Sequence, residues 1–207
     1  GFGPMKAGTQ LETDRLIIRH WTLSPSDRAF FHYINSNAIG RKFYPTRLDR
    51  TAADQRLEEL VAMSATRDLI WAVALLKDTG QAIGYTGLSR IRFERNFSAD
   101  VEIGWQFDPN HWGQGYATET AKALLQHGFS DVGLDEIVAF AVHDNHASVA
   151  VMRRIGMQEV ENGAFDHPPV PDSHPHLKHH VLYAITRSQW HNGRHSGNGL
   201  TDQTISG

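Results

Sequence analysis

A strand-like run, a glycine turn and a helix-like run follow one another in the middle of this chain. Apolar and polar residues alternate over residues 101–107, and a helical pattern starts at Thr118. Gly113 and Gly115 lie between them. The first amides of a helix have no intrahelical acceptor, and the helix dipole adds positive potential there. Since glycines let the backbone approach an anion closely, this order predicts a phosphorylated ligand at residues 113–118.

Two other phosphate-binding loops fit this sequence less well. A nucleoside-triphosphate loop needs Gly-x-x-x-x-Gly-Lys-Ser/Thr, and the sequence has no such run. A dinucleotide fingerprint needs a third glycine where this chain has Thr118. Its acidic residue would be Asp135 or Glu136, which precedes the apolar run at residues 137–142 instead of ending it. A nicotinamide-dependent enzyme is therefore disfavoured, and a glycine turn without a ligand is the plainer alternative.

A second block, residues 145–157, strengthens the case for a ligand. Its apolar residues recur at helical spacing and predict a buried stripe: Val149, Met152 and Ile155. Gly156 stands where a helix C-terminus is expected. Asn145 and Ser148 stand at the entry, where side-chain caps form, and we expect one of the two to cap the helix.

Taken together, the two blocks resemble the signature of the GNAT acetyltransferases. Residues 112–117 resemble their acyl-CoA loop, Gln/Arg-x-x-Gly-x-Gly/Ala, except that Trp112 stands at the first position. Residues 145–157 resemble their segment Asn-x-x-Ser-x-x-x-Met-x-Lys/Arg-x-Gly-Phe/Met. The extended loop and the opening residues 11–16 are similar to the RimJ/RimL-type branch, which acetylates protein N-termini and diverse small amines. The resemblance covers residues 11–187.

The resemblance implies acetyl-CoA as cosubstrate, with a binding site spread over both blocks. It places the phosphates on consecutive loop residues: Trp112, Gly113, Gln114, Gly115, Tyr116, Ala117 and Thr118. It places the pantetheine amides on the preceding strand: Trp105, Gln106 and Phe107. A ligand added to a strand edge makes the bonds of a missing strand. The resemblance also gives Asn145 a hydrogen bond to the pantetheine arm and sets Ser148 near the CoA sulfur, and both roles are compatible with capping.

An N-acetyltransferase needs a neutral amine, because the amine attacks the thioester carbonyl. Neutralising a lysine-like amine of pKa ~10.4 at pH 7 costs about 4–5 kcal/mol, whereas an α-amine at ~7.7–8.0 costs about 1 kcal/mol. The resemblance implies that the strand at residues 101–107 borders the acyl site. Glu102 lies mid-strand on the face opposite the apolar residues and is therefore the best candidate base, acting directly or through water. The alternatives are a solvent-facing Glu102, with His143, Asp144 or water as the base. No tyrosine occupies residues 145–154, so by the resemblance we expect Ser148 to stabilise the leaving thiolate.

Acceptor choice is expected in a histidine-rich stretch, residues 166–180. A metal site there would use four histidines: His174, His176, His179 and His180. Their spacing matches no defined zinc pattern, so we expect no metal. We interpret the proline-containing stretch as a lid beside the acceptor pocket. The residues expected to contact the acceptor are Phe165, Asp166 and His167.

The order of elements is strand, two helices, three strands, helix, strand, helix, strands. It predicts an α/β fold, with a single mixed, mostly antiparallel twisted sheet and helices on both faces. This is also the order of the GNAT-like acyl-CoA acyltransferase fold. We expect the domain over residues 5–187, with the first strand at residues 15–21. Residues 1–4 look like a cloning remnant, and residues 188–207 are polar and expected to form a poorly ordered tail.

Charge, hydropathy and cysteine content limit the possible functions further. With 20 basic and 23 acidic residues the formal charge of the 207-residue chain is −3, so nothing indicates a nucleic-acid partner. No apolar stretch is long enough to span a bilayer and no signal segment is visible, so we expect a cytoplasmic protein without a membrane partner. The lack of cysteine excludes disulfides and a cysteine nucleophile. We expect a monomer or homodimer that transfers acetyl groups to amines; the alternative is a catalytically silent module that binds or senses acyl-CoA.

Overall fold

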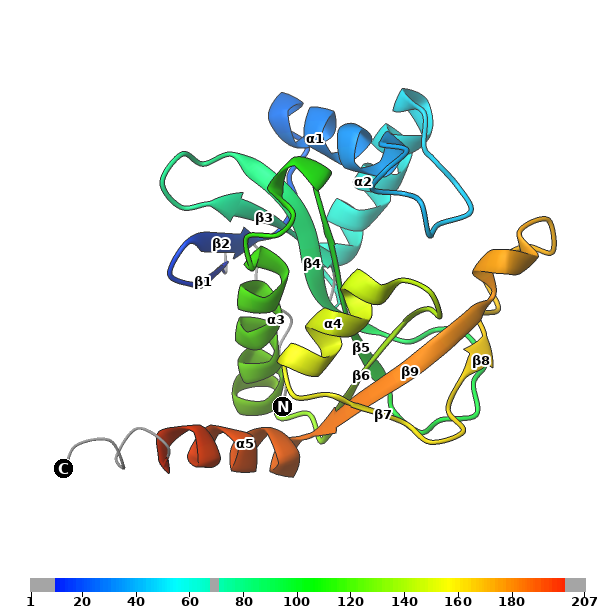
Figure 1. The fold of residues 1–207 in the computed structure, drawn as a ribbon. Helices are drawn as coiled ribbons and strands as arrows, with labels where there is room; N and C mark the ends of the chain where they lie inside the picture. The colour runs from blue at the N-terminus through cyan, green and yellow to red at the C-terminus, as the bar shows by residue number, and fades with distance from the viewer. Residues whose placement is uncertain (1–9, 68–70, 200–207) are drawn as a thin grey trace.

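A single twisted sheet forms the centre of the computed structural model, which describes residues 10–67 and 71–199 (Figure 1). Within these residues the sheet has nine strands in the order β1-β2-β3-β4-β5-β6-β9-β7, with β8 paired to β9. Neighbouring strands are antiparallel except β5 and β6, which confirms the predicted mixed, mostly antiparallel sheet. The strands are β1 (Gln10–Glu12), β2 (Leu16–Arg19), β3 (Trp71–Leu76), β4 (Ala82–Arg90), β5 (Val101–Phe107), β6 (Glu136–Val142), β7 (Gln158–Glu159), β8 (Phe165–Asp166) and β9 (His179–Thr186).

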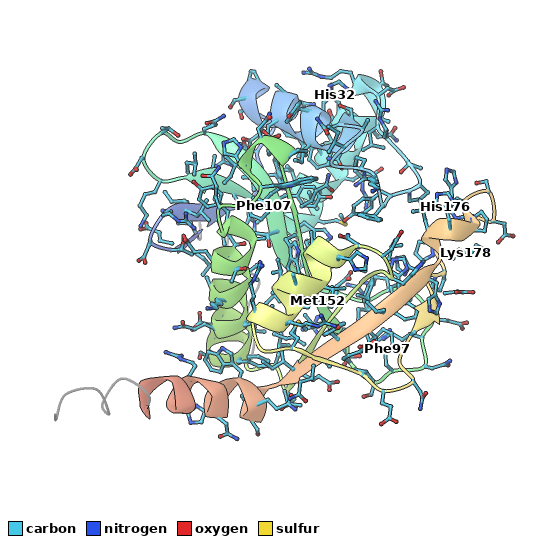
Figure 2. All side chains as sticks on the ribbon, viewed as in Figure 1. His32, Phe97, Phe107, Met152, His176 and Lys178 are labelled. Carbon is cyan, nitrogen blue, oxygen red and sulfur yellow. The ribbon has the colours of Figure 1, made fainter. Side chains whose placement is uncertain are left out.

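Helices cover both faces of the sheet, as predicted. On one face α1 and α2 bury Phe31 and Leu57 against Val73. On the other face α3 and α4 bury Leu125 and Met152 with Ile103 (Figures 1 and 2). The helices are α1 (Pro25–Ser36), α2 (Arg50–Ser64), α3 (Tyr116–Gln126, continued by a π-helical turn at His127–Val132), α4 (His146–Arg154) and α5 (Arg187–Gly199).

Side chains that act as N-caps begin the first two helices. Ser24 Oγ accepts a hydrogen bond from Asp27 N at 3.2 Å and begins α1. Asp49 Oδ1 accepts one from Ala52 N at 2.8 Å and begins α2. Asp27 also receives two bonds from the Arg19 guanidinium, each 2.9 Å long. These bonds fasten α1 to the end of β2 and so fix the helices that cover one side of the later site.

The side chains of β5 alternate between the two faces of the sheet. Val101, Ile103 and Phe107 are buried on the face covered by α3 and α4. Gln106 points the other way and reaches α1, since its Nε2 donates to Ile34 O at 2.9 Å. The observed alternation agrees with the predicted period of two, and it sets Glu102 on the face of α1 and α2.

Strands β5 and β6 run side by side only briefly. All residues of β5 pair with β4, from Arg90↔Val101 to Gly84↔Phe107. β5 pairs with β6 at Glu102↔Val138, the single register pair recorded between these strands in the described chain. A gap therefore opens between the C-terminal halves of the two parallel strands. The sequence pattern does not reveal this gap, and it becomes the centre of the candidate site.

The N-terminal region differs from its predicted form. The strand expected at residues 15–21 is the shorter β2, and it follows β1 in a hairpin whose turn is closed by Thr13 N donating to Leu16 O at 2.9 Å. Strand β3 is observed from Trp71, and residues 68–70 before it lie outside the described chain. None of the helices in the described ranges is long and apolar enough to cross a membrane.

Helix α5 occupies the first part of the segment predicted to be a poorly ordered tail. Thr186 Oγ1 accepts from Gln189 N at 3.1 Å, and Gln189 Oε1 accepts from Thr186 N at 2.9 Å, which makes a reciprocal capping box. The Trp190 ring packs against Phe129 with centroids 5.5 Å apart. This cap and contact explain a helix that polar composition did not predict. The predicted remnant at residues 1–4 and the end of the tail, residues 200–207, lie outside the described chain.

Candidate functional site

The loop between β5 and α3 takes its shape from two glycines with positive φ. Gly113 has φ 76° and Gly115 has φ 80°, where residues with a Cβ are strained. A Cβ on Gly113 would meet no described atom within 4 Å, and one on Gly115 would meet only Arg15 Nη2, at 3.5 Å. Gln114 between them is exposed. The two glycines therefore leave open space over the start of α3.

The start of α3 presents backbone N–H groups to that space. Gly115 is the N-cap and has no side chain that accepts a bond. The first bond within the helix runs from Glu119 N to Gly115 O at 3.0 Å. Among the described residues no acceptor is recorded for the amides of Tyr116, Ala117 and Thr118. These amides and the positive end of the helix dipole together favour an anion.

Arg15 brings a full positive charge to the same place from 104 positions away in the sequence. Its Nε donates to Glu119 Oε1 at 2.8 Å, and its guanidinium lies 4.4 Å from the centroid of the Tyr116 ring. Burial acts to raise the pKa of Glu119, but hydrogen bonds from Thr13 and Arg15 prevail and lower it. Arg15 is thus held beside Gly115. It brings a positive charge to a loop that has the uncharged Trp112 at the motif position where Gln or Arg is usual.

The other end of the loop is anchored by Trp112 and Asp108. Trp112 Nε1 donates to Phe107 O at 2.9 Å, while the residue stays 53% exposed. Asp108 Oδ1 accepts from the Tyr33 hydroxyl at 2.7 Å and from Asn110 N at 3.2 Å. These bonds tie the loop to the end of β5 and to α1, so the glycines are held in position before any ligand arrives.

The gap beside β5 leaves one set of backbone groups without a neighbouring strand. The backbone N–H and C=O groups of the even-numbered residues of β5 face β4. Asp108 N donates to Ile83 O at 2.8 Å, and Gly104 O accepts from the Thr86 hydroxyl at 2.7 Å. Backbone groups alternate along a strand, so those of Trp105 face the gap. An extended ligand with amide groups entering the gap would pair with Trp105 as an added strand does.

Gln106 and Phe107 are placed differently from Trp105. The Gln106 backbone faces β4, and its Oε1 accepts from the Tyr85 hydroxyl at 2.8 Å, so this residue fastens the strand to its surroundings. The Phe107 carbonyl accepts the Trp112 bond already described, which leaves its N–H directed to the gap. Of the three residues predicted to hold pantetheine, Trp105 therefore offers two backbone groups to the gap and Phe107 one.

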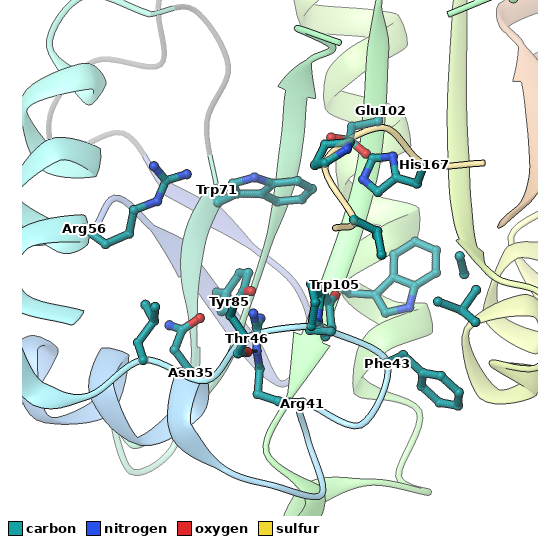
Figure 3. Close-up of a pocket in the computed structure, with 18 of the residues that line it drawn as sticks. Asn35, Arg41, Phe43, Thr46, Arg56, Trp71, Tyr85, Glu102, Trp105 and His167 are labelled. Atoms are coloured by element: carbon teal, nitrogen blue, oxygen red, sulfur yellow. Dashed lines mark hydrogen bonds between the residues drawn. The ribbon is translucent and has the colours of Figure 1, made fainter. Parts of the chain in front are cut away.

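A cavity of about 820 Å³ joins the gap to the space beneath α1 and α2 (Figure 3). It brings together residues singled out from distant parts of the sequence: Glu102, Trp105, Asn145, Ser148 and His167. Much of its remaining wall is aromatic and includes Trp71, Tyr85 and Phe140. A strand residue, a helix N-terminus and a loop after β8 thus line one cavity.

Glu102 lines this cavity and is not a solvent-facing strand residue. Burial raises the pKa of its carboxyl to about 8. The Trp71 indole lies against Gly104, where a Cβ would stand 2.4 Å from its Cη2, so only glycine leaves room for that ring. Figure 3 shows Trp71 and Glu102 on the same side of β5. A carboxyl whose pKa lies near neutrality is suited to accept and return a proton.

Asn145 caps α4, which confirms that one of the two predicted residues forms the cap. Its Oδ1 accepts from Ser148 N at 3.3 Å. Ser148 lines the cavity, and no hydrogen bond joins its Oγ to another described residue. The hydroxyl is therefore available to an atom inside the cavity, and the helix start does not depend on it.

Of the three predicted acceptor contacts, His167 lines the cavity and the other two do not. Burial, and secondarily the neighbouring His180, lowers the pKa of His167 to about 4, so its ring is neutral at physiological pH. Phe165 packs against a buried cluster of apolar and aromatic side chains beside β9. Asp166 is exposed, with Oδ1 3.6 Å from His179 Nδ1.

The secondary base candidates lie outside the cavity. His143 and Asp144 are exposed, and neither is among the residues that line it. His143 Nδ1 lies 3.4 Å from His179 O. Within the described residues no group of His, Asp or Glu side chains is arranged to hold a metal ion.

Two arginines at the site, Arg15 and Arg41, were not predicted from the sequence motifs. Arg15 lies in residues 11–16, and the only interpretation given to this segment was its resemblance to the start of RimJ/RimL-type proteins. Arg41 enters the cavity from the loop after α1, where its Nη1 donates to Gln106 Oε1 at 3.2 Å. The contacts that place them span 104 and 65 positions, a range at which spacing patterns carry no information.

Comparisons with known proteins agree with this geometry. A family model described as an acetyltransferase (GNAT) domain matches residues 15–158. The uncharacterized N-acetyltransferase YoaA of Bacillus subtilis is 29% identical over 157 residues, which cover 72% of this chain and 82% of YoaA. The FsC-acetyl coenzyme A-N(2)-transacetylase of Aspergillus fumigatus is 34% identical over 118 residues, 54% of this chain and 48% of that protein. A GNAT-family acetyltransferase of Bacillus anthracis has a similar solved structure, with a TM-score of 0.70, 25% identity and coverage of 86% of this chain and 99% of its own.

Proposed function

Because this chain belongs to the GNAT acetyltransferase family, we propose that it is an acetyl-CoA-dependent N-acetyltransferase that acts on a primary amine by direct attack on the thioester. One observation carries the proposal. Glu102, a half-buried carboxyl with its pKa near neutrality, and Ser148, whose hydroxyl bonds to no other described residue, both line the cavity at the gap between β5 and β6. The cavity therefore holds both a proton acceptor and a donor for a departing anion.

The residues present fit acetyl-CoA. The amides of residues 116–118, the open space over Gly113 and Gly115, and the Arg15 guanidinium suit its phosphates. The backbone of Trp105 suits the amides of its pantetheine arm, and Asn145 lines the same cavity. Acetyl-CoA supplies the activated acetyl group, and this chain orients it and handles protons.

The proposed reaction balances without a further reactant. The amine nitrogen attacks the thioester carbonyl carbon, the carbon–sulfur bond breaks, and the nitrogen loses a proton. Glu102 accepts that proton, directly or through water. The Ser148 hydroxyl donates a hydrogen bond to the thiolate, which is stabilised more strongly than the uncharged thioester. A proton from solvent then completes free CoA, since a serine hydroxyl is a poor acid.

We place the chain in the RimJ/RimL-type branch on the sequence of residues 112–119 and 11–16. The acceptor is then a protein N-terminus or a small-molecule amine. An α-amine with a pKa of ~7.7–8.0 suits Glu102, whose own pKa is about 8, because proton transfer between matched groups costs little. The neutral ring of His167 contacts the acceptor at the cavity wall. We further propose an acetyltransferase domain at residues 5–187 that acts in the cytoplasm as a monomer or homodimer.

Two measurements test this function in sequence. Acetyl-CoA at a hundredfold excess over Kd should add about 2.7 kcal/mol to the free energy of unfolding. NAD at the same concentration should add nothing, and the reverse pattern would contradict the loop assignment. Thiol release from acetyl-CoA should then depend on an added amine from a panel that includes Ser and Ala N-terminal peptides. Stabilisation without any thiol release would indicate the silent acyl-CoA-binding module instead.

A further inference from the structure

Arg41 is a cation fixed in the wall of the cavity on the acceptor side. Its Nε donates to Thr46 O at 3.1 Å and its Nη1 donates to Gln106 Oε1 at 3.2 Å. Its guanidinium also lies 4.0 Å from the centroid of the Tyr44 ring. Figure 3 shows the side chain directed from its loop toward Tyr85. These contacts hold the guanidinium in one orientation before any substrate binds.

No described carboxylate forms an ion pair with Arg41. Several other arginines of the described chain are paired, Arg19 with Asp27 and Arg28 with Glu58 among them. Arg41 bonds to neutral oxygens of Thr46 and Gln106 and also to the Tyr85 hydroxyl, which leaves part of its five N–H groups without an acceptor among the described residues. A partly enclosed guanidinium with N–H groups to spare is suited to a planar or tetrahedral oxyanion, which it binds by charge-assisted, often paired, hydrogen bonds.

The place of Arg41 relative to Glu102 sets the spacing of a ligand. Arg41 bonds to the side chain of Gln106, and Glu102 lies four residues earlier on the same face of β5. That interval spans roughly 13 Å of strand. The Trp71 indole lies against Gly104 between them and forms an apolar floor. A proton acceptor and an anion site therefore stand at opposite ends of one aromatic surface.

Resting on the proposed function, we infer that the acceptor amine carries an oxyanion several bonds away and that Arg41 binds it. The amine lies at the Glu102 end and the carboxylate or phosphate at the Arg41 end. A free α-amino acid is too short to bridge them, whereas a short peptide or an ω-amino acid is long enough at about 3.3–3.6 Å per residue. Polyamines, which bear only positive charge, would meet an unpaired cation and are disfavoured.

The test compares matched acceptors that differ only in the distant charge. The kcat/KM for thiol release is measured with glycine, diglycine, triglycine and tetraglycine, each as the free acid and as the C-terminal amide. 6-Aminohexanoate and 5-aminopentyl phosphate compare carboxylate with phosphate. The free acid should be preferred about tenfold to a hundredfold at the favoured length, the scale of a charge-assisted hydrogen bond. Arg41→Gln should abolish that preference and leave the KM for acetyl-CoA unchanged.

Two controls separate recognition from damage to the loop. Lys42→Gln removes the neighbouring exposed cation and should leave the preference intact. The amide substrates control for folding, because a loosened loop would lower turnover of acid and amide alike, and Arg41→Lys should restore part of the preference. Equal kcat/KM for acids and amides in the unaltered protein would overturn the inference. An Arg41→Gln variant that loses both equally, or whose KM for acetyl-CoA rises, would also overturn it.

A binding measurement keeps this inference separate from the proposed function. With CoA present, N-acetyl-triglycine should bind more tightly than its C-terminal amide, and Arg41→Gln should remove the difference. If this preference holds while no amine is ever acetylated, the transferase proposal fails and the role of Arg41 stands. If amines are acetylated but the two ligands bind equally, the role of Arg41 fails and the transferase proposal stands.

Discussion

At the scale of single residues, the proposed chemistry depends on the surroundings of Glu102. An exposed glutamate titrates near pH 4.3, whereas burial in the cavity raises the pKa of Glu102 to about 8. The sequence predicted its face on β5 from alternation alone. Its place in a cavity was beyond the sequence, because other residues that line the cavity, Trp71 and His167 among them, are distant in the chain.

The first prediction concerns the rate. Glu102→Gln keeps the size of the side chain but removes its ability to accept a proton, so kcat should fall by about 10²–10⁴-fold with unchanged acetyl-CoA affinity. In the unaltered enzyme kcat/KM should fall with decreasing pH below about 8, as Glu102 becomes protonated. The variant should lack the Glu102 part of this pH dependence, measured against the same amine. Equal kcat and pH profiles for both proteins would move the base to solvent.

The second prediction concerns stability and follows from the same raised pKa. Below pH 4 Glu102 is protonated in both the folded and the unfolded chain, so burial has no electrostatic cost there. Between pH 4.5 and about 8 the unfolded chain gains stability by losing this proton while the folded chain keeps it. Glu102→Gln should therefore raise the free energy of unfolding relative to the unaltered protein, by up to a few kcal/mol at pH 8 and by little at pH 4. Denaturant titrations at both pH values measure this, and a constant difference would contradict it. Glu159→Gln, at an exposed position, is the matched control.

At the scale of elements, the start of α4 divides two roles between two residues. Asn145 accepts the capping bond, and Ser148 Oγ is left to the cavity. The sequence placed both at the helix entry but could not assign the cap, since either side chain is suited to it. The assignment depends on backbone geometry that forms only when α4 packs on the sheet.

The third prediction follows from that division. Asn145→Ala should cost roughly 0.5–2 kcal/mol of stability, the usual cost of a lost helix cap. Ser148→Ala should leave the melting temperature nearly unchanged and lower kcat, because the thiolate charge develops only in the transition state. Melting curves paired with kcat at saturating acetyl-CoA distinguish the two variants. A lowered melting temperature with normal kcat in Ser148→Ala would assign this residue to structure.

The fourth prediction concerns the glycine loop and uses a second turn as its control. Gly115 and Gly80 have similar positive φ, 80° and 73°, and Gly80 lies in the turn between β3 and β4 with no described atom within 4 Å of a Cβ. Alanine at either position should cost about 1–2 kcal/mol of stability through backbone strain. Gly115→Ala should also weaken CoA binding, while Gly80→Ala should not. Calorimetric Kd values for CoA provide the comparison, and equal affinity in all proteins would remove the loop from the site.

At the scale of the whole molecule, local patterns predicted the elements and their order but not how distant parts meet. Alternation and helical spacing are properties of neighbouring residues, and they gave the mixed sheet with helices on both faces. The gap between β5 and β6, the approach of Arg15 to Gly115 and the entry of Arg41 into the cavity all depend on packing across the fold. The reciprocal capping bonds of Thr186 and Gln189 were not predicted, because the polar composition of residues 188–207 indicated a poorly ordered tail.

We propose that the cavity at the gap between β5 and β6 transfers acetyl groups from acetyl-CoA to amines with Glu102 as proton acceptor. The most direct measurement follows free CoA and acetylated amine together, by thiol titration and mass spectrometry, over the oligoglycine series. We expect equal amounts of the two products from the unaltered protein and a loss of about 10²–10⁴-fold in Glu102→Gln, the scale of general base catalysis. Tight acetyl-CoA binding with thiol release no faster than in buffer, for every amine, would contradict it.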